Sequence, residues 1–222
     1  MNPIRSVRPL IVGFCLAAVA LLPSAPVLAD SSGWKVGYYT PSGRTLSNAE
    51  TAPGSGIASF NFTDQPSTAL LVTKHGSAKG ASLGDLTGKT ITATFEISGA
   101  NTPFIYFGEP SCGTNNSTVR LFFLTSNAGG FDETHYWWSN PTSFVLSNTS
   151  SAITLTASLG DPSSWSDFFG HFGDDPGFPG FTNAVSNVTT IGLSFGGGCF
   201  FENGVGTVDG SGTFTLDSFD VG

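Results

Sequence analysis

The segment FDETHYWWSNP, residues Phe131–Pro141, is a short aromatic run that alternates like a β-strand. Successive side chains of a strand point to opposite faces, so Trp137 is expected on one face and Tyr136 and Trp138 on the other. In a β-sandwich, one face of a sheet is core and the other meets solvent or a site. At least one of these rings is therefore expected where a ligand can reach it.

Other segments of the chain also read as strands. In Lys89–Ser98 and Ala152–Leu159, apolar residues alternate with polar ones, which is typical of antiparallel strands with one buried face. Apolar runs between turn residues predict further strands. These lie at Gly33–Thr40, Ala58–Phe62, Ala69–Lys74, Thr189–Phe195 and Gly212–Val221.

Two more predicted strands, Thr102–Glu109 and Thr118–Thr125, are apolar on both faces, and Arg120 lies on the second face of the latter. A sandwich needs only one apolar face per strand, so the second face is either covered by neighbouring segments or forms a groove. We expect these second faces and the aromatic strand Tyr136–Asn140 to form one apolar floor. The aromatic loop Gly160–Gly180, which has no strand period, is expected to border or cover it.

The C-terminal part of the chain completes the predicted fold. The apolar alternation of the last strand slips by one residue between Leu216 and Phe219, which a β-bulge at Asp217-Ser218 corrects. Strands outnumber helices and no βαβ rhythm is present. The predicted fold class is therefore all-β: a two-sheet antiparallel β-sandwich (jelly roll) with one short helix near residues 178–187.

The first 29 residues are typical of an export signal. Two arginines precede the apolar run Leu10–Leu22, and Val27-Leu28-Ala29 is a small-residue cleavage site. Cleavage after Ala29 leaves residues 30–222 as a single β-sandwich domain, expected to be secreted to the extracellular space or the periplasm. No second long apolar segment follows, so we expect no membrane insertion, and we expect a monomer.

The charge of the chain limits its partners. Loss of residues 1–29 removes two arginines and no acidic residue, which takes the net charge from −8 to −10. Nucleic acid and anionic membranes require basic patches. Neither is therefore an expected partner.

The predicted mature chain keeps two cysteines, Cys112 and Cys199. An even pair in an exported protein favours a disulfide between them. Two reactive or metal-binding thiols are the alternative, but no cluster of partner ligands accompanies either cysteine.

The order of several elements resembles the jelly-roll, galactose-binding-like sandwiches of carbohydrate-binding modules. These elements are DLTGKTITATFEISG, the two strands apolar on both faces, a helix leading into NVTTIGLSFGG, and the closing FTLDSFDV. The resemblance covers roughly residues 50–222. It implies a glycan ligand bound on a concave face or at loop tips by stacked aromatic rings. It also implies a structural calcium ion near the chain ends, and Asp217 stands where such modules place an acidic ligand.

Catalytic motifs are scarce in this sequence. Asp132 and Glu133 are adjacent, so on a strand they point in opposite directions, whereas a glycosidase needs two carboxylates that face each other. No G-x-S-x-G motif is present, and the three histidines are isolated. The chain is therefore not expected to be an enzyme, with a polysaccharide lyase or hydrolase as the less favoured alternative.

The sequence predicts a secreted, non-catalytic domain that binds carbohydrate through an aromatic-lined sheet face or loop. Rings offer flat apolar faces to sugars, and nearby polar groups can bind hydroxyls. A structural or adhesive extracellular domain without a small-molecule ligand is the alternative, in which most of the rings are core. At least two of the three tryptophans of the predicted site are expected in the core. The predicted ligand-binding residues are Tyr136, Trp137, Trp138, Trp165, Arg120, Asn140 and His171.

Overall fold

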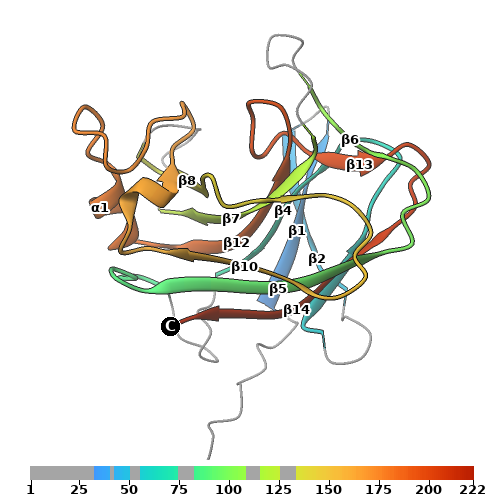
Figure 1. Cartoon of the computed structure of the whole chain (residues 1–222), viewed down its shortest axis with the longest axis horizontal. Helices are drawn as coiled ribbons and strands as arrows, with labels where there is room; N and C mark the ends of the chain where they lie inside the picture. The colour runs from blue at the N-terminus through green and yellow to red at the C-terminus, as the bar shows by residue number, and fades with distance from the viewer. Residues whose placement is uncertain (1–32, 41–42, 51–55, 75–82, 109–115, 126–133) are drawn as a thin grey trace, which may run out of the picture.

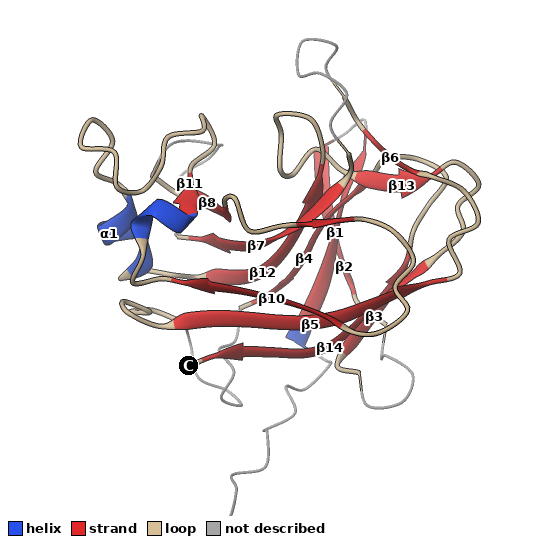
Figure 2. Ribbon diagram, in the orientation of Figure 1, coloured by secondary structure: helices blue, strands red, loops and turns tan. Residues whose placement is uncertain are grey.

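The protein is a sandwich of two antiparallel β-sheets (Figures 1 and 2), as the sequence predicts. The structure, a computed structural model, describes residues 33–40, 43–50, 56–74, 83–108, 116–125 and 134–222. The predicted export signal and Cys112 lie outside the described residues. The smaller sheet has the order β10 (Ile153–Ser158), β5 (Thr90–Ser98), β14 (Thr213–Val221) and β3 (Ala58–Asn61).

The larger sheet faces it and contains ten strands. Its main path is β11 (Trp165–Ser166), β8 (Tyr136–Ser139), β7 (Thr118–Leu124), β12 (Thr190–Gly196), β4 (Thr68–Thr73), β1 (Trp34–Thr40) and β2 (Gly43–Asn48). Three short strands attach to this path. They are β13 (Val205–Thr207), which pairs with β4, β6 (Phe104–Tyr106), which pairs with β13, and β9 (Phe144–Val145), which pairs with β7.

The main core lies between the two sheets. In β5, alternate residues from Ile91 to Ile97 are fully buried, while the residues between them are partly or fully exposed. The inner face of β7 opposes them with Val119, Leu121 and Phe123, all at 0% exposure. Alternation in the sequence therefore identifies the core face of these strands correctly, because burial of one face fixes the strand register.

The predicted β-bulge in the last strand is confirmed. The register between β14 and β5 shifts between Leu216 and Ser218. Phe214, Leu216 and Phe219 are all buried as a result, and Val221 is partly buried against the same core. The extra residue restores the apolar side chains to one face.

The predicted helix is also confirmed, as α1 (Phe181–Val185), and its buried residues are Phe181, Ala184 and Val185. The loop before it holds a 3-10 turn, η3 (Pro162–Ser164), and the short strand β11. The sequence did not predict β11, nor β2, β9 and β13. Among the described residues, no helix combines the length and the apolar character that crossing a membrane requires.

The predicted apolar floor forms on the outer face of the larger sheet, but only in part. Phe122 and Leu124 of β7 pack there with Tyr136 and Trp138 of β8 and with apolar residues of β4. The prediction that Thr102–Glu109 belongs to this floor is wrong. β6 pairs with β13 instead and is not a neighbour of β7, because the sequence pattern marks a strand as apolar without fixing its partner.

Candidate functional site

Two of the predicted ligand-binding tryptophans are core residues. Trp137 and Trp165 are each 0% exposed and pack around Phe123 and Phe181. The expectation that their rings stack on a sugar is therefore contradicted by their burial. The expectation that at least two of the three tryptophans belong to the core is confirmed. Trp137 is inward because of its position in the alternation of β8, and Trp165 donates its Nε1–H to the carbonyl oxygen of Ser158, 2.9 Å away.

Tyr136 and Trp138 lie on the opposite face of β8, as the alternation predicts, but both are almost fully covered. Their exposed fractions are 3% and 2%. Phe168, from the loop predicted as a cover, and Phe201, from the turn after β12, pack over them. The floor is therefore sealed above Tyr136 and Trp138, and a sugar cannot stack on these two rings there.

Arg120 is held by the protein itself. Its Nη1 donates a 2.7 Å hydrogen bond to the carbonyl oxygen of Ser139, and its guanidinium carbon lies 3.9 Å from the centre of the Phe201 ring. Burial lowers the pKa of Arg120 to about 10, since low-dielectric surroundings disfavour a charge. These contacts connect Arg120 of β7 to the end of β8 and to the turn after β12.

Asn140 and His171 also have structural partners. The Asn140 side-chain amide donates to the hydroxyl of Ser166, 3.2 Å away. His171 Nδ1 lies 2.9 Å from Asp167 Oδ2, and its ring stacks on Phe178. These contacts hold both side chains to the loop before α1, and their predicted role in ligand binding stays a prediction.

Asp217 occupies the bulge of β14. Burial, and secondarily the charge of Glu96, raise the pKa of its carboxyl. Calcium takes six to eight oxygen ligands, and the described residues hold no group of three or more His, Cys, Asp or Glu that could bind a metal. The predicted calcium ion stays a prediction, which the melting temperature with and without a chelator tests.

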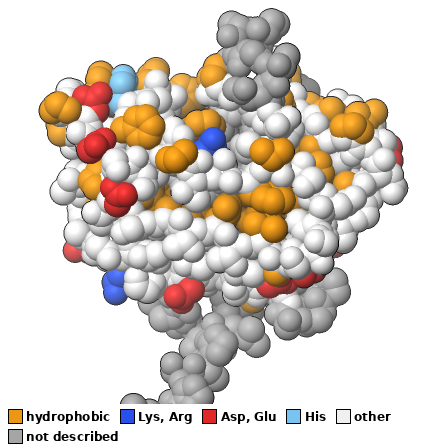
Figure 3. Space-filling view, viewed as in Figure 1, with side chains coloured by type: hydrophobic (Ala, Val, Ile, Leu, Met, Phe, Trp, Pro, Cys, Tyr) orange, Lys and Arg blue, Asp and Glu red, His pale blue; other side chains and the backbone are white. Residues whose placement is uncertain are grey.

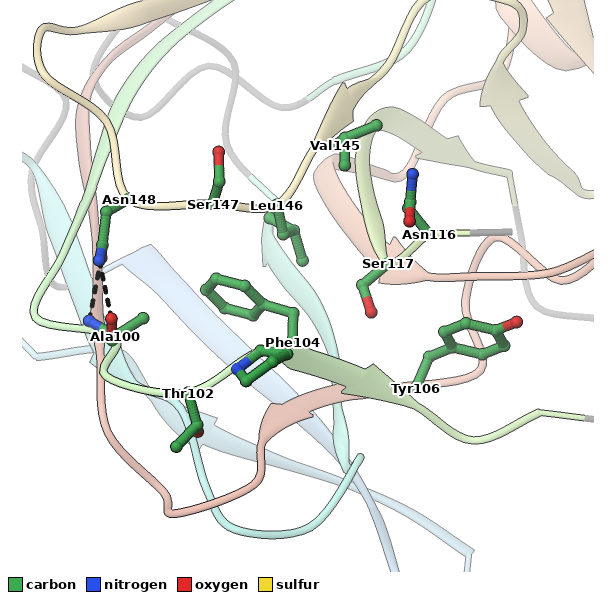
Figure 4. Close-up of a pocket in the computed structure, with 11 residues that line it drawn as sticks. Ala100, Thr102, Phe104, Tyr106, Asn116, Ser117, Val145, Leu146, Ser147 and Asn148 are labelled. Carbon is green, nitrogen blue, oxygen red and sulfur yellow. Dashed lines mark hydrogen bonds between the residues drawn. The ribbon is translucent and has the colours of Figure 1, made fainter. Parts of the chain in front are cut away.

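A groove with a polar lining and a volume of about 390 Å³ lies beside β6 (Figure 4). We call it the β6 groove. Three segments far apart in the sequence meet there. They are residues 100, 102–104 and 106, residues 116–117 just before β7, and residues 145–148 from the end of β9 onward.

The walls of the β6 groove are tied together by side-chain hydrogen bonds. The Asn148 amide accepts from the backbone nitrogen of Ala100 at 2.9 Å and donates to its carbonyl oxygen at 2.7 Å, as Figure 4 shows. The Thr102 hydroxyl donates to Asp209 Oδ1 at 2.8 Å. One wall is therefore anchored both to the opposite wall and to the turn before β14.

Two aromatic rings, Phe104 and Tyr106, line this groove. Phe104 packs edge-on against Phe62 of the core, with 4.9 Å between ring centres. Tyr106 lies against Gly197, where a Cβ atom would come within 2.4 Å of the ring. A glycine at position 197 thus makes room for Tyr106, and both rings are partly exposed and held in place.

A buried hydroxyl lies at the edge of the groove. Ser117 is 4% exposed, and its Oγ has no hydrogen-bond partner in the structure. In Figure 4 this oxygen points into the space beside Phe104 and Tyr106. Buried polar groups are nearly always hydrogen-bonded to protein or water, so the Ser117 hydroxyl is a candidate donor or acceptor at the edge of the groove, with no partner among the described residues.

The described lining of the β6 groove carries no charge. Its eleven residues include no Asp, Glu, Lys, Arg or His, and side-chain amides and hydroxyls supply its polarity. On the face shown in Figure 3, charged side chains lie mainly toward the margins, and hydrophobic ones gather nearer the middle. The described lining can therefore form neutral hydrogen bonds and ring contacts, and it holds no carboxylate or imidazole for proton transfer.

None of the groove residues was predicted as a site residue. The segment Thr102–Glu109 is apolar on both faces. This sequence feature could have identified Phe104 and Tyr106 as candidate site residues. Asn116 and Asn148 lie in loops whose approach to β6 depends on the pairing of β9 with β7. The alternation of apolar and polar residues does not predict which strands pair, so it could not predict this pairing.

Comparison with known proteins gives one finding. No family model and no curated protein matches the sequence. Among solved structures, the chain is similar to a xylan-binding module CBM15, with 13% sequence identity and a TM-score of 0.40, over 83% of this chain and 90% of that chain.

Proposed function

We propose that the protein is a secreted, non-catalytic domain that binds carbohydrate in the β6 groove. One observation carries this proposal: the lining combines two fixed rings, Phe104 and Tyr106, with amides and hydroxyls and no charged side chain. Sugars present apolar C–H faces and neutral hydroxyls, so they match rings and uncharged hydrogen-bonding groups.

Each feature of the groove has a role in this proposal. Tyr106 offers a ring face at the rim, while Ser117 offers a buried hydroxyl. The exposed side chains of Asn116 and Ser147 lie on the paired segments that lead into β7 and out of β9, across the groove from β6, and can donate to and accept from sugar hydroxyls. Because the Asn148–Ala100 bonds hold the walls together, the groove loses little conformational freedom when a sugar binds.

The absence of acidic residues from the described lining favours binding over hydrolysis. Glycosidases place two carboxylates on either side of the scissile bond. The β6 groove offers none among its eleven lining residues. We therefore expect retention of polysaccharide without turnover.

Affinity electrophoresis in gels that contain a panel of soluble polysaccharides tests the proposal, with pull-down on insoluble ones. The protein should be made in a host without N-glycosylation, because Asn116 and Asn148 each begin an N-x-[ST] sequon. At least one polysaccharide is expected to retard the protein. Reducing-end assays on the same polymers should show no turnover.

Two variants test whether the β6 groove is the carbohydrate-binding site. Tyr106→Ala removes a ring and Ser117→Ala removes one hydroxyl, and losses of about tenfold and about fivefold in affinity are expected. Leu46→Ala, at a residue that is 52% exposed on β2 and outside the groove, is the matched control. Retention that both variants leave intact would reject the groove as the site. No retention on any polymer would favour a structural or adhesive domain.

A further inference from the structure

A second and larger cavity lies on the outer side of the larger sheet, with a volume of about 1420 Å³. Its aromatic rings come from β1, from β8, from the loop before α1, from the turn after β12 and from the residue after β6. We call it the aromatic cavity. The seven rings are Tyr39, Phe107, Trp138, Phe168, Phe169, Phe200 and Phe201.

Two of these rings are unusually exposed for their type. Phe107 is 64% exposed and Phe169 is 60% exposed. Large apolar side chains at the mouth of a concave apolar site are typical of ligand-binding surfaces. Phe168 and Phe201, by contrast, pack against the floor beneath and form the base of the cavity.

The described lining of the aromatic cavity offers no free cation to an anionic ligand. Asp64, Asp167 and Glu202 are among its described residues, and no lysine or arginine is. The two arginines close to the lining have partners already. Arg44 is paired with Glu202, and Arg120 binds the Ser139 carbonyl beneath the Phe201 ring.

Two buried polar atoms of the lining residues have no hydrogen-bond partner among the described residues. They are the Nε1–H of Trp138 and the Oε2 of Glu202, each with less than 1 Å² of accessible area. An unsatisfied buried donor or acceptor costs about 1–3 kcal/mol. A ligand oxygen that displaces part of the ring packing over Trp138 can therefore satisfy its N–H.

We propose that the aromatic cavity binds an uncharged aromatic small molecule that carries a hydroxyl or carbonyl oxygen. The rings supply stacking faces, the described lining holds no free cation to pair with an anion, and the Trp138 N–H supplies a donor for the ligand oxygen. This site is separate from the β6 groove: it shares none of its lining residues. A sugar suits it poorly, because most sugar hydroxyls would face rings and remain unpaired.

Dye displacement tests this proposal on the whole mature chain. N-phenyl-1-naphthylamine, an uncharged dye that brightens in apolar surroundings, is expected to bind with a saturable signal. 2-Naphthol should displace it at a concentration at least about tenfold lower than 2-naphthalenesulfonate does. Equal displacement by the two compounds, or no saturable dye signal, would overturn the proposal.

Variants locate the site and test the donor. Phe169→Ala, at an exposed ring, should weaken dye binding about tenfold, whereas Leu46→Ala should not. Trp138→Phe keeps a ring but removes the N–H, so 2-naphthol should bind about fivefold more weakly while naphthalene is unaffected. A parallel loss for both compounds would reject the role of the N–H, and dye binding that Phe169→Ala leaves unchanged would reject the cavity.

Polysaccharide retention separates this proposal from the carbohydrate proposal. Phe169→Ala is expected to leave retention unchanged, because Phe169 does not line the β6 groove. A joint loss of retention and dye binding would show one shared site and would overturn the assignment of two ligands to two places.

Discussion

Arg44 Nη1 donates a 2.8 Å hydrogen bond to Glu202 Oε1, which joins β2 to the turn after β12 across 158 residues of chain. The Tyr39 hydroxyl donates to the same oxygen at 3.2 Å. The Glu202 side chain is only 3% exposed. The pair therefore fixes the edge of the larger sheet at the margin of the aromatic cavity.

The first prediction is that Glu202 makes stability fall as pH rises. Burial outweighs the lowering effect of Arg44 and raises the pKa of Glu202 from 4.5 to about 7. Between these two pH values the folded chain keeps a proton that the unfolded chain has lost, so folding is stabilised below about pH 4.5 and that contribution is lost by about pH 7. The loss is about 3 kcal/mol at most.

Urea denaturation of the protein and of Glu202→Gln across this pH range measures the effect. Glutamine is isosteric and can still accept from Arg44, but it does not titrate. The difference in unfolding free energy between the two proteins should therefore change with pH in the predicted direction. A difference that stays constant from pH 4.5 to 7 would show that the carboxyl titrates near its ordinary value.

The second prediction concerns Trp137, which the sequence marked as a ligand residue and the structure places in the core. Trp137→Ala removes a ring that stacks on Phe123 and meets Phe181 edge-on. Loss of a buried ring of this size costs about 3–5 kcal/mol of stability. Urea denaturation should show this loss, and Leu46→Ala should stay within about 0.5 kcal/mol of the parent. A cost below about 1 kcal/mol would argue that the ring is not part of the core.

The strands and the core could be predicted from the sequence because their signals are local. The alternation in Lys89–Ser98 repeats at every second residue and marks β5 directly. The phase slip at Asp217 marks the bulge in the same way. The alternation of β8 also places Trp137 inward and Trp138 outward correctly.

Two features could not be predicted from the sequence, because both depend on tertiary contacts. They are the rings that cover the outer face of the larger sheet, and the β6 groove. Phe201, which covers the floor, comes from a glycine-rich turn without strand alternation. The strand β2 was not predicted because its residues are mostly exposed and form no apolar face. The β6 groove requires β6 to pair with β13 and β9 with β7. Alternation fixes which way a side chain points but does not select the neighbouring strand.

The third prediction is the disulfide between Cys112 and Cys199, which the described residues leave as a prediction. The bond would close a loop of about 87 residues and contribute roughly 4–5 kcal/mol in the chain-entropy model. Thiol titration of the unfolded, unreduced protein should find no free thiol, and Cys199→Ser should expose one. Two titratable thiols in the parent would contradict the pairing.

The fourth prediction is that Asn148 positions the walls of the β6 groove. Its amide makes two hydrogen bonds to Ala100, one as acceptor and one as donor. Asn148→Ala removes both, so the amide hydrogen of Ala100 should exchange faster with solvent while the neighbouring bond from Thr149 N to Ile97 O stays protected. Because Asn148 is exposed, the cost in global stability should be only about 1 kcal/mol.

The matched variants of this prediction separate wall position from direct contact with a ligand. Asn148→Asp keeps the acceptor for the Ala100 N–H but loses the donor to its carbonyl, so exchange at Ala100 should lie between that of the parent and that of Asn148→Ala. Ser150→Ala, at an exposed residue two positions along, should change nothing. If polysaccharide retention falls in step with the exchange rate across the three variants, wall position controls binding. If retention falls equally in Asn148→Asp and Asn148→Ala while their exchange rates differ, Asn148 instead contacts the sugar through its side-chain nitrogen.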